Sequence, residues 1–111
     1  MKVKTQGHTT IIKDTKGDIS SFLDNITQQY HSYKNTNLIL DISHAKDTEN
    51  KDVLSFLNLS NQHRKNKKSF VLVMQEDFDF NSSTTKIMVV PTLQEAHDII
   101  EMEEIERDLG F

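Results

Sequence analysis

The chain has 111 residues, and this length predicts that residues 1–111 form a single domain around one hydrophobic core. It contains no cysteine, which excludes disulfides, thiolate catalysis and cysteine-based metal sites. The formal net charge of −4 disfavours general nucleic-acid binding, because such binding needs a net cationic face. No stretch is apolar enough for a signal peptide or a membrane span, so we expect a cytoplasmic protein without a membrane partner.

The first part of the chain predicts a hairpin followed by a helix. Residues 2–6 and 9–13 are short β-leaning runs, and Gly7-His8 between them suits a tight turn because glycine accepts positive φ. Asp18 is the predicted N-cap of a helix that reaches about Tyr33. Its apolar residues fall on one face at helical spacing: Ile19, Phe22, Leu23, Ile26 and Tyr30.

The middle of the chain predicts a buried strand, a polar turn and an amphipathic helix. Residues 38–42, Leu-Ile-Leu-Asp-Ile, show no alternation of apolar and polar residues and read as a strand that ends in a carboxylate, Asp41. This pattern favours a central strand covered on both faces. The polar turn covers residues 43–52. The helix is predicted from Val53 to about His63, with Leu54 and Leu59 at the two edges of a stripe formed by Val53, Phe56, Leu57 and Ser60.

Two more buried strands are predicted at residues 70–74 and 87–90. Pro91 ends the second, and Thr92 with Glu95 forms a capping box for a helix that runs to about Leu109. The order is therefore β-β-α-β-α-β-β-α. Strands joined through helices favour parallel pairing with right-handed crossovers, so the predicted fold class is α/β, with a mostly parallel central sheet and helices packed on it.

Strand, polar turn and helix at residues 38–57 resemble the STAS domain, which anti-sigma factor antagonists and sulfate-transporter tails share. Residues 90–96, Val-Pro-Thr-Leu-Gln-Glu-Ala, resemble its last strand and helix start, and the predicted order follows its outline over nearly the whole chain. That family carries Asp-Ser-Ser-Gly in the turn, and a partner kinase phosphorylates the first serine. Residues 49–52, Glu-Asn-Lys-Asp, stand at those positions. The resemblance therefore implies a STAS-like domain without the phosphoacceptor.

The chain departs from the STAS pattern between its last two strands, and its final residues resemble a second group of proteins. STAS domains usually carry a helix between the last two strands, whereas residues 75–85 of this chain read as a loop, which implies a reduced form. Residues 103–111 also resemble the end of short bacterial chains labelled ribonuclease Z. That enzyme needs a His-x-His-x-Asp-His motif on a far larger fold, and this sequence has neither.

The turn before the second helix has two interpretations. The resemblance implies that it docks a protein partner, as a non-enzymatic regulatory module of bacterial cytosol would. It can also be a polar cap, with Asp47, Thr48 or Asn50 as N-cap and nearby carboxylates favouring the helix dipole. Thr48 is not an expected kinase site, because it precedes the aligned position by two residues. The predicted docking residues are Thr48, Glu49, Asn50, Lys51, Asp52, Leu54 and Leu59.

The last predicted helix is apolar on two sides, since Leu93, Ala96 and Ile100 form one stripe and four residues form another: Ile99, Met102, Ile105 and Leu109. Such a helix is kinked or buries its second side elsewhere. We expect Met102, Ile105 and Leu109 to contact a partner or a second copy, with packing across the chain's own sheet as the alternative. Docking here would suit a small scaffold or subunit, a homodimer included, in a larger assembly such as one of RNA metabolism.

Other motifs give weaker signals. Residues 77–82 open like a calcium loop, but Ser82 replaces the required glycine and Met88 the bidentate glutamate. Phe78 and Phe80 in this loop either pack against the sheet or join a partner surface.

The basic run at 63–68 suits a helix carboxyl end, with phosphate binding as the alternative. No histidine pair has metal spacing and no nucleophile or acid–base pair stands out, so we expect no enzyme, cofactor or metal.

Overall fold

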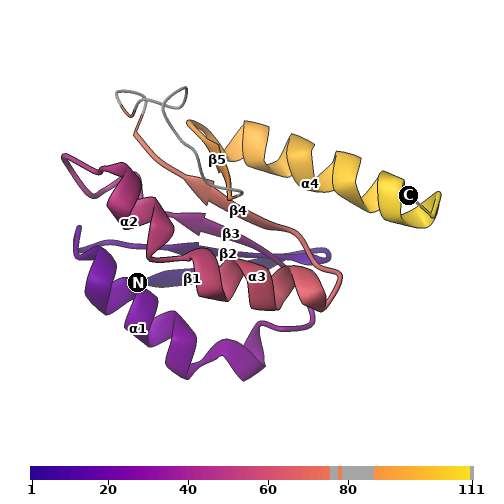
Figure 1. Cartoon of the computed structure of the whole chain (residues 1–111), viewed down its shortest axis with the longest axis horizontal. Helices are drawn as coiled ribbons and strands as arrows, with labels where there is room; N and C mark the ends of the chain where they lie inside the picture. The colour runs from indigo at the N-terminus through magenta and orange to yellow at the C-terminus, as the bar shows by residue number, and fades with distance from the viewer. Residues whose placement is uncertain (76–77, 79–86, 111) are drawn as a thin grey trace.

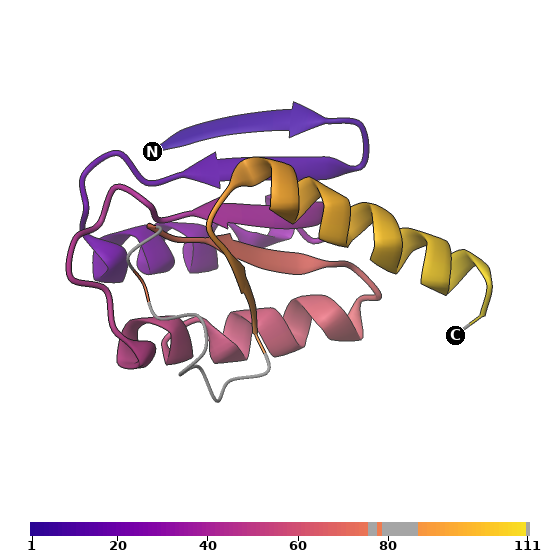
Figure 2. The same cartoon turned by 90° about the horizontal axis from the view of Figure 1, so that it is seen from above.

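The computed structural model describes residues 1–75, 78 and 87–110. They contain a five-stranded sheet whose spatial order follows the sequence order (Figures 1 and 2). The strands are β1 (Lys2–Gln6), β2 (Thr9–Lys13), β3 (Asn37–Asp41), β4 (Phe70–Val73) and β5 (Met88–Val90). The first pair is antiparallel and the other three pairs are parallel, which confirms the predicted α/β class with a mostly parallel sheet.

Helices cover both faces of this sheet, but unequally. They are α1 (Ile19–Gln28), the 3-10 turn η1 (Tyr30–Ser32), α2 (Asn50–Leu54), α3 (Leu57–Lys65) and α4 (Leu93–Asp108). Figure 1 shows α1, α2 and α3 on one face and α4 on the other. Successive residues of β3 point to opposite faces of the sheet. Leu38 and Leu40 pack in the core on the side of α1, α2 and α3, and Ile39 packs in the core on the side of α4. All five residues of β3 are buried, including the polar Asn37 and Asp41 at its ends, which agrees with the predicted central strand covered on both faces.

The predicted caps of α1 and α4 are confirmed. The Asp18 carboxylate accepts the Ser21 backbone N–H at 3.1 Å and the Ser21 hydroxyl at 2.9 Å. These bonds favour the charged form and lower the pKa of the Asp18 carboxyl below its usual value. The Thr92 hydroxyl accepts the backbone N–H of Glu95 at 3.1 Å, which is the first half of the predicted capping box.

Two helices differ from the predicted ones: the first is shorter, and the second begins at Asn50 rather than at Val53 and is interrupted. The first ends at Gln28, and η1 then carries the Tyr30 ring into the core. The second is interrupted between α2 and α3, where the Ser55 hydroxyl donates to the Asp52 carbonyl oxygen at 2.5 Å. A hydroxyl that bonds back to the preceding turn competes with the helical hydrogen bond and bends the chain. The bend places Phe56, which is fully buried, in the core.

A chain of polar groups centred on the buried Tyr30 and His63 joins the end of α3 to η1 and to the residue before β3. The Asn66 amide donates to the Tyr30 hydroxyl at 3.1 Å, which lies 2.7 Å from His63 Nδ1. His63 Nε2 lies 2.7 Å from the Thr36 carbonyl oxygen. Because a carbonyl oxygen only accepts, Nε2 carries the proton and Nδ1 accepts from Tyr30. Burial raises the pKa of Tyr30 and lowers the pKa of His63 to about 4, so the imidazole is neutral.

The carboxyl end of α3 has a lysine where glycine is usual. Lys67 has a φ of 62°, its N–H bonds the Arg64 carbonyl at 2.9 Å, and the Lys68 N–H bonds the His63 carbonyl at 3.4 Å. These two bonds define a Schellman motif, whose left-handed position glycine fills at the least conformational cost. The lysine at this position is therefore unfavourable for local folding.

Candidate functional site

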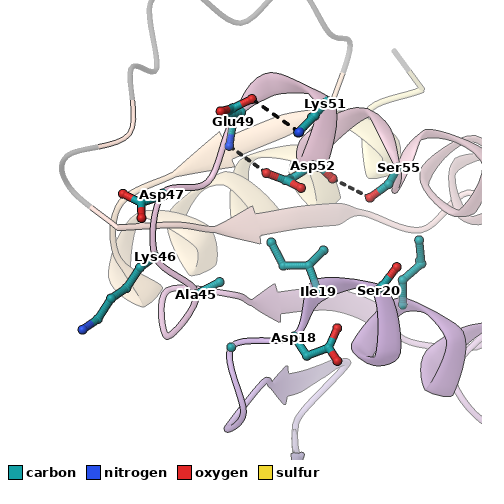
Figure 3. Close-up of a pocket in the computed structure, with 12 residues that line it drawn as sticks. Asp18, Ile19, Ser20, Ala45, Lys46, Asp47, Glu49, Lys51, Asp52 and Ser55 are labelled. Atoms are coloured by element: carbon teal, nitrogen blue, oxygen red, sulfur yellow. Dashed lines mark hydrogen bonds and ion pairs between the residues drawn. The ribbon is translucent and has the colours of Figure 1, made fainter.

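A groove of about 520 Å³ lies beyond the carboxyl ends of β2 and β3, between the start of α1 and the start of α2 (Figure 3). In open parallel sheets, ligands commonly bind outside the carboxyl ends of the strands. The groove is lined by Gly17, Asp18, Ile19, Ser20, Leu23, Ala45, Lys46, Asp47, Glu49, Lys51, Asp52 and Ser55.

Two buried carboxylates shape the loops that lead into this groove. Asp14, just after β2, accepts the backbone N–H groups of Lys16 at 3.0 Å and Gly17 at 2.9 Å. Asp41, at the end of β3, accepts the Ser43 backbone N–H at 3.0 Å and its hydroxyl at 2.6 Å. Sequence reasoning noted the carboxylate that ends the third strand but missed Asp14. The shared signal is an aspartate at or directly after a β run, where its oxygens can accept from the turn that follows.

The N-cap of α2 is Glu49, so the predicted N-cap at Asp47, Thr48 or Asn50 is wrong. Glu49 has the extended backbone of an N-cap, with φ of −118° and ψ of 172°, whereas Asp47 is left-handed with φ of 55°. Asp52 reaches back and accepts the Glu49 backbone N–H at 2.8 Å. The cap interpretation of the turn therefore holds, but with a different residue at the cap.

Three of the predicted docking residues line the groove: Glu49, Lys51 and Asp52. Thr48 instead lines a separate cavity of about 190 Å³, and its hydroxyl lies 3.4 Å from the Ala45 carbonyl oxygen. Asn50 begins α2 and is half-buried. The Lys51 ammonium lies 3.8 Å from the Glu49 carboxylate, but both side chains are exposed, so this ion pair contributes little to stability.

Leu54 and Leu59, both predicted as exposed docking residues at the edges of the helix stripe, have opposite environments. Leu54 is 48% exposed, whereas Leu59 is 5% exposed and belongs to the core under α1, α2 and α3. The prediction for Leu59 is therefore wrong. The interruption between α2 and α3 changes the helical phase, and α3 turns Leu59 inward beside Ser60 and His63.

The groove combines an apolar floor with an acidic rim. Ile19 and Leu23 are partly buried and pack on the core, and Ala45 is buried between them and the strands' ends. Four carboxylates and two ammonium groups line the groove, an acidic excess of two: Asp18, Asp47, Glu49 and Asp52 against Lys46 and Lys51. Figure 3 shows the Ile19 side chain pointing toward α2 and the Lys46 side chain extending away from α2. Such a groove fits a segment with apolar and basic side chains.

The outer side of α4 is apolar and uncovered. Met102 is 59% exposed, Ile105 54% and Leu109 65%. Helical spacing places them on the side of α4 opposite to Ala96 and Ile100, which are buried against the sheet. Packing of these three residues on the chain's own sheet, one of the two alternatives, is therefore wrong. Ile99, the remaining residue of the predicted second stripe, does pack against the core between α4 and the sheet.

The remaining sequence predictions concern metals, membranes and the segment before β5. Within residues 1–75, 78 and 87–110, no three His, Asp or Glu side chains are grouped as metal ligands. Among the helices of this described part, none has the length and apolar character needed to cross a membrane. The calcium-like segment 77–82 lies outside the described residues except for Phe78, which is buried in the core. Phe80 also lies outside them. Comparison of this sequence with protein-family models and with curated proteins finds no match.

Proposed function

We propose that this chain is a non-enzymatic protein-interaction module, a reduced STAS-like domain that resembles an anti-sigma factor antagonist without the phosphoacceptor. The observation that carries the proposal is the groove between α1 and α2, with its apolar floor and acidic rim at the carboxyl ends of β2 and β3. Leu54 extends this surface along α2, since about half of its side chain is open to solvent.

The proposed partner is a protein segment that places apolar groups over Ile19 and Leu23 and basic groups against the rim. Asp18 and Asp52 already accept backbone N–H groups at the two helix starts. Glu49 belongs to the capping box of α2 and lies near Lys51, so Asp47 is the carboxylate best placed for a partner, with the exposed Glu49 beside it. Residues 49–52 offer no hydroxyl group to a kinase. We therefore expect that phosphorylation of these residues does not regulate binding, so that the partner's concentration sets the fraction of the chain that is bound.

Asp47→Asn/Glu49→Gln is expected to weaken partner binding about tenfold, because it removes two rim charges and keeps the side-chain shapes. Asparagine also tolerates the left-handed backbone at position 47. Partners would be captured from native lysate with the tagged chain and identified by mass spectrometry, and their affinity measured by calorimetry. The matched control is Glu101→Gln/Glu106→Gln, which removes two exposed charges from α4. Equal weakening by both pairs would contradict docking in the groove.

The second candidate function is a scaffold subunit or homodimer that docks through α4. The exposed stripe of Met102, Ile105 and Leu109 favours it, because a contiguous apolar face on a surface helix is a usual interaction surface. Ile105→Gln, with Leu54→Gln as its control on α2, separates the two proposals. If sedimentation shows self-association that only Ile105→Gln abolishes, the scaffold function replaces docking in the groove. If only Leu54→Gln reduces capture of the lysate partner, docking in the groove is supported.

A further inference from the structure

A cavity of about 420 Å³ lies at the end of the molecule opposite to the groove, where β3 and β4 begin. It is lined by Arg64, Lys67, Lys68, Arg107 and Gly110. These residues come from two places that are far apart in the sequence, the carboxyl end of α3 and the carboxyl end of α4. All of the lining side chains that carry charge are cationic, on a chain whose overall charge is negative.

The two arginines are held in place by the start of the sheet. Arg107 Nη2 donates to the Ser69 hydroxyl at 3.1 Å and to the Asn37 side-chain oxygen at 3.4 Å. Arg64 Nη2 donates to the Phe70 carbonyl oxygen at 3.2 Å. Neutral oxygens hold Arg107, and the Phe70 carbonyl oxygen together with the Glu103 carboxylate holds Arg64. The orientation of both guanidinium groups is therefore determined before any ligand arrives, which reduces the entropy cost of binding.

Three of the four cationic side chains that line the cavity take part in no close ion pair within the described residues. Arg64 pairs with Glu103 at 3.5 Å. Across the described part of the chain, Lys67, Lys68 and Arg107 form no ion pair within 4.0 Å. Like charges that converge on one cavity repel one another, and a bound anion would relieve that repulsion.

Helix dipoles alone do not account for this arrangement. A cation in the last turn is favoured by the carbonyl end of its helix, and Arg64 and Arg107 each satisfy that preference. Lys67 and Lys68 lie beyond the last turn of α3. Lys67 also occupies the left-handed Schellman position, where glycine would cost the fold less. A non-glycine residue in a left-handed conformation costs conformational energy, and such residues cluster at functional sites.

We propose that this cavity binds the phosphate group of a small phosphate monoester. A guanidinium group offers a planar pair of donors that matches phosphate oxygens, and lysine adds compact positive charge. The cavity is larger than a phosphate group requires and lies within the size range of small-molecule sites, which leaves room for an organic portion. The site is separate from the groove and does not depend on the proposed function.

The test is a titration of the full-length chain, labelled with ¹⁵N, with inorganic phosphate and with glycerol 3-phosphate. Low salt limits the screening of the cationic cavity, and a pH of about 8 keeps both phosphate compounds mainly as dianions. We expect saturable shifts of the amide signals around Lys67, Lys68 and Arg107. Tighter binding of glycerol 3-phosphate than of inorganic phosphate assigns the monoester, and equal affinities assign the phosphate group alone; both outcomes support the site.

Three variants decide whether the cavity is responsible. Arg107→Gln should weaken binding at least about tenfold, because it removes a preorganised charge. Lys67→Gly should weaken binding about threefold while raising Tm, since glycine suits the left-handed position, so that lost binding cannot be attributed to unfolding. Lys65→Gln is the matched control, an exposed lysine on the same helix outside the cavity lining, and should change affinity less than about twofold.

The proposal is overturned by a titration that does not saturate with either phosphate compound. It is also overturned if Lys65→Gln weakens binding as much as Lys67→Gly does, because general charge screening would then explain the response. Unchanged affinity in a folded Lys67→Gly chain, together with unchanged affinity in Arg107→Gln, would likewise rule out phosphate binding in this cavity.

Discussion

Replacing Phe56 by alanine is expected to lower the free energy of unfolding by about 3–5 kcal/mol. The Phe56 ring is fully buried where α2 passes into α3, and it belongs to the core shared by α1, α3 and the sheet. Truncation removes its apolar contacts and leaves a cavity that the interrupted helix can only partly close. Urea denaturation followed by circular dichroism measures the loss.

Leu54→Ala is the matched control for Phe56→Ala, because it truncates a large apolar residue two positions earlier that is 48% exposed. Its free energy of unfolding should change by no more than about 0.5 kcal/mol. A Phe56→Ala loss below about 1 kcal/mol would contradict the packing described at the junction of the two helices.

Acidification from pH 6.5 to about 4 is expected to remove up to about 3 kcal/mol of stability through His63 alone. Burial lowers the pKa of this imidazole from 6.5 to about 4 in the folded chain. The unfolded chain therefore binds a proton first as the pH falls below 6.5, and the contribution of the neutral imidazole is complete above that pH. It declines through this window and levels off below the folded-state pKa.

The measurement is the free energy of unfolding of the chain and of His63→Gln at several pH values across this window. The variant should be less stable at neutral pH, because glutamine fits the Tyr30 and Thr36 partners poorly. Its loss on acidification should be smaller than that of the unaltered chain, since the titrating group is gone. His31→Gln, which changes an exposed histidine, should leave the pH dependence as it was. Parallel pH curves for the chain and His63→Gln would refute the role of His63.

Local patterns were sufficient to predict the strands and the starts of α1 and α4, but not the start of α2. The absence of alternation at residues 38–42 predicted the buried centre of the sheet, and Asp18 and Thr92 predicted the two caps that are confirmed. These features depend on residues within a few positions of one another. The interruption at Ser55 was missed, because a serine side chain that bonds back to a carbonyl looks the same in sequence as a solvated one.

Only part of the candidate site could be predicted. Glu49, Lys51 and Asp52 were predicted as docking residues from the resemblance of the turn to that of STAS domains, yet the groove they line also needs Ile19 and Leu23 from α1. The sequence contains no local signal that α1 and α2 lie side by side, because their positions depend on how each helix packs on the sheet. The same limit explains the wrong assignment of Leu59, whose exposure depends on the phase of α3 after the bend. The His63 contacts with Tyr30 and Thr36 likewise join residues that are distant in sequence.

The agreement between strand order and sequence order has a consequence for biosynthesis. Each strand pairs with the one made just before it, so the sheet can grow by one strand at a time as the chain leaves the ribosome. The face that carries Ile39, Val71 and Val73 is covered, among the described elements, by α4, which follows all five strands. A nascent chain therefore holds an open apolar sheet face until α4 emerges, and a translational pause before that helix would prolong its exposure to chaperones and to other nascent chains.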